Sequence, residues 1–508
     1  MISHIACMKH FIGVLFCLLA AGEPAFSQEF NEALDQIRAE YNLTGLAAAA
    51  TCQGTPVETY YGGVRNLQTG APLNEDTYFR IASVSKAFTA AALLRLSEAG
   101  AFQLDDDVSD ALGYLLRNPN HPTVPITYRM LLNHTASIQD GTGYSGFLGA
   151  TTATDDPPSV TEILLPGGSF YTANMWRLEV PGTHFAYSNM TYGMIGTLVE
   201  IHADMRFDQF VNSQVLEPLG IAGSFNTADI EDIDNLSPLY RNSIPQADNF
   251  QGTAPPAFDN PDYVPGTNGL RFGPQGGLRT NLEGMLTFGN LLINHGVHEG
   301  VSFLDSTTVA EMLLPQWTHT GNNGDNFFGL FNSWGLGIHR SLGITGNGSG
   351  DAVFPGTVMY GHPGEAYGLL SDLYVHPETG FVFAFLTNGY TVAGNYAFGS
   401  TTTFYAVEEA VFSAFEESAW AACQTVASTE ETERAQACRD IYCDARTGLL
   451  YNTGEAPVQF EVYSSSGKCT ERGILHHSHE PKVEALGIYV VRILRHDGHT
   501  CVLKTARF

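Results

Sequence analysis

Lysine is almost missing from this chain: between His10 and Gly467 the sequence contains a single one, Lys86. Because lysine is normally among the commonest residues, its scarcity leaves arginine to supply positive charge to the surface. Lys86 ends the segment 79–86 and follows Ser83 by three positions. Either this lysine escaped a general depletion by chance, or its ammonium group is retained for chemistry.

Basic residues of any kind are outnumbered. The 508 residues include 53 acidic and 24 basic side chains, which gives a net charge of −29. Such an excess of negative charge opposes binding to nucleic acid or to an anionic membrane surface. We expect a small molecule or a peptide as the substrate, and the sequence does not indicate an oligomeric state.

Long apolar runs are missing after the first 27 residues, so no later segment is long enough for a membrane span. Residues 1–27 have the pattern of a secretory signal peptide. Lys9 and His10 give a positive start, residues 11–21 an apolar core, and residues 25–27 a small-residue cleavage site. We expect an exported protein, located in the periplasm, at the cell surface or outside the cell.

Cysteine is scarce too, and two of the eight cysteines lie in the predicted signal peptide. The remaining six are an even number in an exported chain, which favours disulfides over a metal or redox site. The sequence does not determine their pairing. Full pairing would bring Cys52 to the C-terminal end of the chain, where the other five lie: Cys423, Cys438, Cys443, Cys469 and Cys501.

The main body of the chain, residues 28–423, has strand patterns near both ends and helical patterns between them. Amphipathic spacing predicts a helix at 30–41, and strong helix formers predict another after Ser83. A closing helix is predicted at 402–421, and strands at 46–52, 57–64, 335–339, 357–361, 366–375 and 381–386. This order predicts an α+β fold: one antiparallel sheet built from both chain ends, flanked by helices, with an inserted helical region.

Residues 424–508 have a different composition. Lysine returns at Lys468, Lys482 and Lys504, and alternating apolar residues predict strands at 458–462 and 487–493. We expect a small β-rich module that contains cysteines. Its last segments resemble the C-terminal sorting domains that carry proteins through a bacterial outer-membrane secretion system, and the alternative is an ordinary accessory module.

Two long loops rich in Pro, Gly, Asn and Asp interrupt the main body, at residues 247–269 and 318–328. Loops of this length are either the functional rim of a pocket or simple insertions.

The spacing of Ser83 and Lys86 has a physical meaning in a helix, where positions i and i+3 lie on one face. The positive end of the helix dipole favours developing negative charge on a hydroxyl at the N-terminus. A neighbouring amine can accept the hydroxyl proton if burial lowers its pKa, since a free lysine is protonated at neutral pH. Ser83 is therefore a candidate nucleophile, and Lys86 is its candidate activating partner.

Two later stretches add polar groups in a recognisable order. Residues 181–189 place Tyr187 and Asn189 two positions apart after a turn, and residues 361–364 place His362 at the start of a late strand. The chain thus has Ser-x-x-Lys early, Tyr-Ser-Asn in the middle and His-Pro-Gly late.

This combination resembles the penicillin-recognising serine hydrolases, in the branch of class C β-lactamases, D-alanyl-D-alanine carboxypeptidases, D-aminopeptidases and related esterases. The likeness covers about residues 30 to 420 and includes the stretches 100–106, 126–135 and 276–278. It implies a β-lactamase/transpeptidase-like fold. His134, in the second of these stretches, is expected to be structural.

The resemblance implies a mechanism that needs no metal or organic cofactor. Ser83 would attack a carbonyl group to give an acyl-enzyme, with Lys86 and Tyr187 sharing the proton transfers. A cation beside Tyr187 would lower the pKa of the phenol and favour phenolate as the base. Asn189 would orient the substrate or the lysine. The backbone N–H groups of Ser83 and Glu365 would form the oxyanion hole, and water would then hydrolyse the ester.

The late motif departs from the β-lactamases of this branch, which carry Lys-Thr-Gly where this chain has His362, Pro363 and Gly364. A hydroxyl at the middle position usually helps to hold a substrate carboxylate, and Pro363 has neither a hydroxyl nor an N–H. Efficient penicillin hydrolysis and recognition of a C-terminal carboxylate are both put in doubt. The Glu365 side chain would repel a carboxylate and attract an amine, or it faces solvent and contributes only its backbone.

The sequence favours an exported serine hydrolase that acts on an ester or on a small D-amino-acid amide or peptide. The alternatives are a β-lactamase or D-alanyl-D-alanine carboxypeptidase, and a non-catalytic penicillin-binding-like sensor or surface protein.

Overall fold

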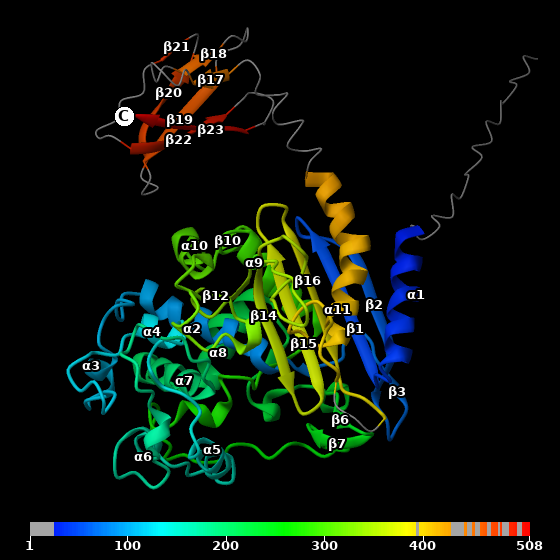
Figure 1. The fold of residues 1–508 in the computed structure, drawn as a ribbon, viewed down its shortest axis with the longest axis vertical. Coiled ribbons are helices and arrows are strands. Elements are labelled where there is room, and N and C mark those ends of the chain that lie inside the picture. The colour runs from blue at the N-terminus through cyan, green and yellow to red at the C-terminus, as the bar shows by residue number, and fades with distance from the viewer. Residues whose placement is uncertain are drawn as a thin grey trace, which may run out of the picture.

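The computed structural model describes residues 25–392 and 396–427, together with seven strands between residues 441 and 507 (Figure 1). Its centre is a nine-stranded antiparallel sheet in the order β11-β12-β13-β14-β15-β16-β1-β2-β3. In that order the strands are Trp317–Thr318, Ser333–Trp334, His339–Ser341, Met359–Ala366, Leu369–His376, Phe381–Thr387, Gly45–Cys52, Thr55–Asn66 and Ala71–Pro72. The predicted α+β class and antiparallel sheet are confirmed.

The two ends of the main body meet at the middle of this sheet. β1 pairs with β2 on one side and with β16 on the other, with Leu46 opposite Thr387 and Cys52 opposite Phe381. A single sheet is therefore assembled from segments more than three hundred residues apart in the sequence, as the order of strands predicted.

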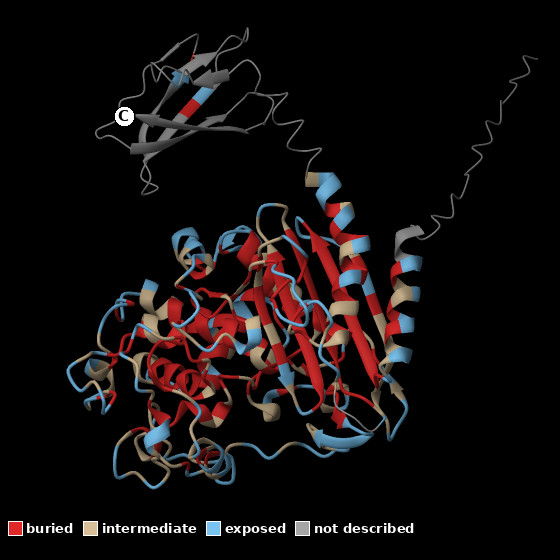
Figure 2. Ribbon diagram, viewed as in Figure 1, coloured by how far each residue is buried: buried red, intermediate tan, exposed pale blue. Residues whose placement is uncertain are grey.

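Both faces of the sheet are buried, and successive residues of a strand point to opposite faces. Along β16, Phe383 and Phe385 face one apolar cluster while Ala384 and Leu386 face the other. Helices α1 (Ala25–Glu40) and α11 (Ala406–Phe415) cover the first face, and the second is covered by α2 (Ser85–Glu98) and α9 (Leu282–Ile293). Figure 2 shows the central strands buried between these layers.

The inserted region between β3 and β11 is mainly helical. Helix α7 (Asn189–Ala203) packs against α2 in its core. The other helices are α3 (Val108–Leu112), α4 (Tyr128–Leu132), α5 (Tyr144–Thr152), α6 (Thr161–Leu164), α8 (Phe207–Val211) and α10 (Ser306–Leu313). Short strands join its loops: β4 (Phe79–Arg80), β5 (Gly223–Ser224) and β8 (Arg279–Thr280) in one sheet, and the pairs β6 (Leu239–Arg241) with β7 (Ile244–Ala247) and β9 (Val297–His298) with β10 (Val301–Ser302).

Three predicted elements are wrong in detail. The strand expected at 357–361 is displaced to Met359–Ala366 (β14), so His362 lies inside a strand and not at its start. Residues 335–339 do not form one strand, because Gly337 takes a positive φ of 74° and the Gly335 N–H donates to the Ile338 carbonyl, which makes a turn between β12 and β13. The closing helix starts at Ala406 instead of residue 402, because the backbone N–H of Thr402 donates to the Glu409 carboxylate at 2.7 Å and ends a separate loop there.

The C-terminal residues that the structure describes are all in strands. One sheet has the order β20-β19-β22-β23 and the other β17-β18-β21. The strands β17 to β23 are Ile441–Cys443, Leu450–Asn452, Val458–Ser464, Cys469–Leu475, Ser478–His479, Gly487–Leu494 and Thr500–Arg507. The β-rich character is as expected, while the role as a sorting module stays a prediction.

None of the helices within the described ranges has the length and apolar content that a membrane span needs.

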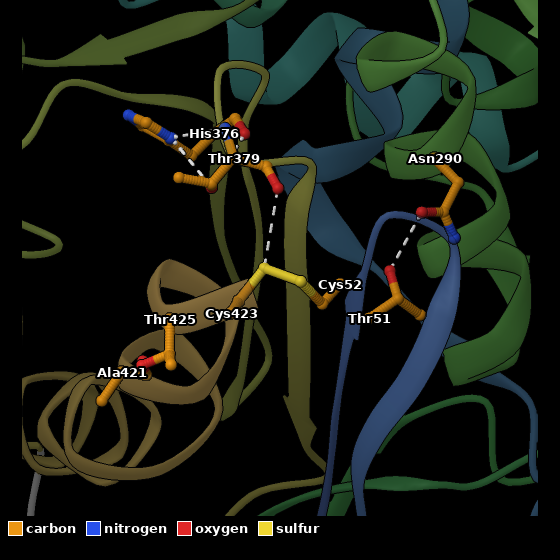
Figure 3. The surroundings of a disulfide bond; sticks show 8 residues. All are labelled: Thr51, Cys52, Asn290, His376, Thr379, Ala421, Cys423 and Thr425. Atoms are coloured by element: carbon orange, nitrogen blue, oxygen red, sulfur yellow. Dashed lines mark hydrogen bonds between the residues drawn. A yellow bond between two sulfur atoms is a disulfide. The ribbon is translucent and has the colours of Figure 1, made fainter. Parts of the chain in front are cut away.

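A disulfide joins the beginning and the end of the main body. Cys52, the last residue of β1, is bonded to Cys423, which follows α11, across a sequence separation of 371 residues (Figure 3). The carbonyl of Thr379 lies 3.6 Å from the Cys423 sulfur in the turn that leads into β16. This bond confirms the expectation that Cys52 pairs with a cysteine near the C-terminal end.

We predict that removing this disulfide destabilises the main body by about 2–4 kcal/mol, because a cross-link that closes a long loop restricts the unfolded chain. Cys52→Ser, Cys423→Ser and the double variant should be compared by chemical denaturation. The two single variants and the double variant should lose the same stability. Additive losses would contradict a bond between these two residues.

Candidate active site

Ser83 lies in a short connection between β4 and α2, where the chain makes a strained turn. The preceding residue, Ala82, has a φ of +46°, a left-handed conformation that costs a non-glycine residue about 1–2 kcal/mol. The turn is held from both sides: the Ile81 N–H donates to the Leu278 carbonyl at 2.9 Å, and the Ser371 hydroxyl donates to the Ile81 carbonyl at 2.9 Å. Such stored strain is found where a side chain must be aimed.

Lys86 is fully buried directly beside Ser83. Its Nζ donates to Ser83 Oγ at 3.1 Å, to Asn189 Oδ1 at 2.9 Å and to the Gln275 carbonyl at 2.7 Å, so all its donors are used. Burial lowers the pKa of Lys86 to about 7, and the charge of Asp140 only partly offsets this. The amine is therefore available in its neutral form near neutral pH.

Tyr187 places its ring over the lysine, with Lys86 Nζ 4.8 Å from the ring centroid. We expected this cation to lower the pKa of the phenol, and that expectation is wrong. Burial raises the pKa of Tyr187 well above its usual value, and a hydrogen bond with Ser83 offsets only part of the increase. Tyr187 is therefore a phenol near neutral pH and can donate a proton.

Asp140 is a residue that the sequence did not single out. Its carboxylate accepts from the Ser188 hydroxyl at 2.9 Å and, at the start of α7, from the N–H groups of Asn189 at 3.0 Å and Met190 at 2.9 Å. It also accepts from Asn189 Nδ2 at 2.8 Å, which fixes the amide so that Oδ1 faces Lys86. No local sequence pattern predicts this role, because the hydrogen-bond partners of Asp140 lie 48 or more positions further along the chain.

Gly364 lets strand β14 approach the nucleophile. A Cβ at this position would lie 2.3 Å from Ser371 Oγ and 2.9 Å from the Ile81 carbonyl oxygen, closer than real contacts allow. Because glycine removes that clash, Ser83, Gly364 and Glu365 line the same pocket. The backbone of Glu365 is thereby available for the oxyanion role predicted for it.

His362 is buried behind this surface and is absent from the pocket wall. Its Nδ1 lies 2.6 Å from the Pro363 carbonyl oxygen, and burial holds its pKa well below the usual value, so the ring is neutral. His134 is also fully buried: its Nδ1 accepts from the Ser188 N–H at 3.2 Å, and its ring lies 4.6 Å from that of Tyr187. His362 thus lies within the protein interior and does not line the pocket. His134 supports the segment that contains Tyr187.

The pocket in front of Ser83 has a volume of about 430 Å³, and we call it the aromatic pocket. Glu365 is exposed on its wall, where its carboxylate accepts from the Tyr405 hydroxyl at 2.9 Å. No lysine or arginine lines it among the residues described. Its aromatic residues are Tyr187, Phe327, Phe328, Phe331, Phe398, Phe404 and Tyr405.

Glu408 is the second carboxyl group on this wall and is almost completely buried. Burial raises the pKa of Glu408 to about 8, and the neighbouring Asp372 is raised well above its usual value for the same reason. Glu408 is therefore mostly uncharged at neutral pH and adds little negative charge to the pocket.

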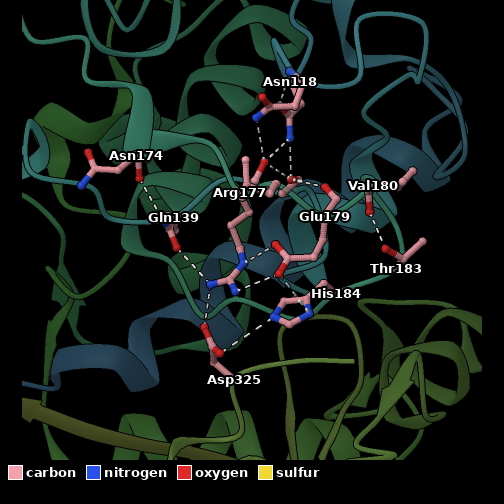
Figure 4. A network of polar contacts seen from close by, with 12 residues as sticks. Asn118, Gln139, Asn174, Arg177, Glu179, Val180, Thr183, His184 and Asp325 are labelled. Atoms are coloured by element: carbon pink, nitrogen blue, oxygen red, sulfur yellow. Dashed lines mark hydrogen bonds and ion pairs between the residues drawn. The ribbon is translucent and has the colours of Figure 1, made fainter. Parts of the chain in front are cut away.

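The loop at residues 318–328 forms one side of the aromatic pocket, as the rim interpretation of that loop predicted. It is pinned by Arg177, whose guanidinium contacts Asp325 at 2.6 Å, Glu179 at 3.0 Å and Gln139 at 3.0 Å (Figure 4). Phe327 and Phe328 follow directly after this anchor and reach the pocket.

Comparisons with known proteins agree with this geometry. Residues 30–402 match the family model described as Beta-lactamase. The chain is similar to penicillin-binding protein 4 of Amycolatopsis lactamdurans, with 25% identity over 363 residues that cover 71% of this chain and 84% of that protein.

Solved structures share the fold at lower identity. One is the D-amino acid amidase from Ochrobactrum anthropi SV3 complexed with L-phenylalanine amide, with a TM-score of 0.54, 20% identity and coverage of 77% of this chain and 98% of that one. Another is the octameric penicillin-binding protein homologue from Pyrococcus abyssi, with a TM-score of 0.54, 18% identity and coverage of 94% and 90%.

We predict that kcat/KM rises with pH up to about 7 and then levels off. The base must be neutral, and the pKa of Lys86 is about 7, so each unit of pH below this value removes about nine tenths of the active form. The profile should be measured with a neutral ester between pH 5 and 9. Glu408→Gln is the control and should retain the rise. A flat profile, or a rise that disappears in the control, would contradict the assignment.

Asp140→Asn should shift that rise to lower pH, because the Asp140 charge raises the pKa of Lys86. The variant should also lose about 10–100-fold in kcat, since one amide oxygen cannot accept from all the donors that the carboxylate holds. Asp110→Asn makes the same charge change in the first turn of α3 and should move neither quantity. An unshifted profile in Asp140→Asn would refute the coupling.

Proposed function

The chain belongs to the beta-lactamase family, and on that premise we propose that it is an exported serine hydrolase that cleaves apolar esters or small D-amino-acid amides and peptides. The observation that carries this proposal is the Lys86 amine, fully buried 3.1 Å from Ser83 Oγ with a pKa of about 7. An amine with these properties can take the proton of the attacking hydroxyl at neutral pH.

The proposed reaction starts when the neutral Lys86 amine accepts the Ser83 proton as Oγ attacks the substrate carbonyl carbon. The resulting oxyanion is held by the N–H groups of Ser83 and Glu365. Tyr187, which burial keeps protonated, donates to the leaving group and regains a proton from the Lys86 ammonium. Water, activated by the same amine, then cleaves the acyl-enzyme and releases the acid.

The walls of the aromatic pocket support a neutral apolar substrate group there. Pro363 offers no hydroxyl, and Glu365 is exposed beside Ser83 where it would repel a carboxylate. A β-lactam or a peptide ending in D-alanine would present its carboxylate to that wall. The β-lactamase and carboxypeptidase alternatives are therefore less well supported than an esterase or amidase. The likeness to a D-amino acid amidase is compatible with an amide substrate.

Export is part of the proposal. The disulfide between Cys52 and Cys423 supports it, because such bonds persist in oxidising compartments outside the cytosol.

The proposal is tested with p-nitrophenyl butyrate, a D-phenylalanine p-nitroanilide and nitrocefin, the last of which carries a carboxylate. We expect the ester or the anilide to exceed nitrocefin in kcat/KM, and Ser83→Ala to lose at least about a thousandfold on every substrate. Ser97→Ala, further along α2, is the control and should retain activity. Turnover that survives in Ser83→Ala, or nitrocefin as the best substrate, would overturn the proposal.

If the protein is instead a penicillin-binding-like sensor or surface protein, the same purified protein gives a different outcome. A fluorescent phosphonate or penicillin would label Ser83 stably, and no ester in the panel would be turned over.

A further inference from the structure

A second cavity shares no lining residue with the aromatic pocket, and one of its lining residues, Arg80, precedes Ser83 by three positions. Its volume is about 560 Å³. One wall is formed by Phe250, Pro256 and Phe258 from the long loop at residues 247–269, the other loop that the sequence marked as a rim or an insertion. We call it the arginine cavity, because Arg80, Arg271 and Arg279 all line it.

The charge of the arginine cavity is opposite to that of the molecule as a whole. The chain has 53 acidic and 24 basic residues, yet no aspartate or glutamate is among the described residues on this wall. An arginine in such a cavity that has no carboxylate partner would attract an anion.

Two of these arginines are neutralised within the protein. Arg279 holds Asp248 through two contacts of 3.2 and 2.7 Å and donates to the Gly277 carbonyl at 2.7 Å. Arg271 pairs with Asp155 at 3.3 Å. The contact with Asp248 holds the start of the loop at residues 247–269, and both ion pairs use the charges of their arginines.

Arg80 has hydrogen-bond donors that no described residue accepts. Its Nε donates to the Gly276 carbonyl at 2.8 Å, and no acceptor for its two terminal nitrogens occurs among the described residues. Its guanidinium carbon lies 5.1 Å from the centroid of the Tyr367 ring. Burial and the nearby Arg279 charge both lower the pKa of Arg80, and the charge of Asp248 offsets part of this decrease.

The arginine cavity is close to the reacting groups. Arg80 precedes Ser83 by three residues, and its acceptor Gly276 lies against Ala82, since a Cβ there would be 3.5 Å from the Ala82 carbonyl carbon. The carbonyl of the preceding residue, Gln275, accepts from Lys86 Nζ at 2.7 Å. Two consecutive carbonyl groups therefore accept from the two cations: that of Gln275 from Lys86 and that of Gly276 from Arg80.

We propose that the arginine cavity is a subsite for a carboxylate of the substrate, anchored by the two free terminal nitrogens of Arg80 beside the aromatic ring of Tyr367. A guanidinium presents two parallel N–H groups that match the two oxygens of a carboxylate. The proposal rests on the proposed hydrolase function and narrows it. The substrate has an apolar group on the side of the aromatic pocket and a carboxylate on the side of Arg80.

The test compares esters that differ only in charge. The p-nitrophenyl monoester of glutaric acid and p-nitrophenyl valerate place the carboxylate, or a neutral end, in the acyl group. The esters 3-carboxyphenyl valerate and phenyl valerate place it in the leaving group. For Arg80→Gln we expect about a 10–100-fold rise in KM for one of the two carboxylate esters, the size of one charged hydrogen-bond pair, and less than about threefold change for both neutral esters.

Arg65→Gln is the matched control, because Arg65 also donates its Nε to a backbone carbonyl, that of Asp234 at 3.0 Å, but lines neither cavity. It should leave all four esters unchanged. Equal losses on charged and neutral esters in Arg80→Gln would show that the arginine only supports the fold. No change on any ester would show that it binds no carboxylate.

A binding measurement separates this proposal from the proposed function. Monoethyl glutarate should bind to the Ser83→Ala protein in calorimetry and should lose about 10–100-fold in affinity when Arg80→Gln is added. This result would support the subsite even if no ester were hydrolysed. Binding of 3-carboxyphenyl valerate is measured in the same way, and equal affinity of the two proteins for both ligands would overturn the subsite even if the hydrolase function held.

Discussion

The burial of the Lys86 amine away from water is the constraint on which the rest of this molecule depends. Lys86 donates to a hydroxyl, an amide oxygen and a backbone carbonyl. These acceptors satisfy its hydrogen bonds without supplying a full negative charge. The nearest carboxylate, Asp140, acts through Asn189 and does not touch the amine. Burial nevertheless lowers the pKa of Lys86 to about 7, so the neutral amine is available near neutral pH, which is the condition for a lysine to act as a base.

The fold brings segments that are distant in sequence to this amine. Ser83 is aimed by the strained turn at Ala82, and strand β14 reaches that turn because Gly364 has no side chain. Helix α7 supplies Asn189 at its first position, where Asp140 holds its amide. The central sheet fixes β14 against neighbours drawn from both ends of the main body. Precision at one side chain is thus obtained from packing over several hundred residues.

Much of this site could be predicted from the spacing of residues in the sequence. The i and i+3 relation of Ser83 and Lys86 survives folding because the short 3-10 helix Ala82–Val84, which contains Ser83, leads directly into α2, which contains Lys86. Short apolar runs bounded by turn residues identified the central strands. Asp140 was missed because its partners are distant in sequence. The pKa of Tyr187 was misjudged because a nearby cation is visible in the sequence, whereas the extent of burial is not. The turn at Gly337 likewise has a partner distant in sequence, because the Gly337 N–H donates to the Leu132 carbonyl at 3.1 Å.

The bond between Cys52 and Cys423 also determines how the protein responds to mechanical force. Tension applied between the N-terminal helix and the chain beyond residue 423 passes from β1 straight across the sulfur atoms. The intervening residues form a closed covalent loop outside that load path. Ser83, Lys86 and Tyr187 all lie within this loop, as do the residues that line both cavities up to Glu408. A pull on the C-terminal strands can therefore strain the edges of the main body while the hydrolytic site stays unloaded.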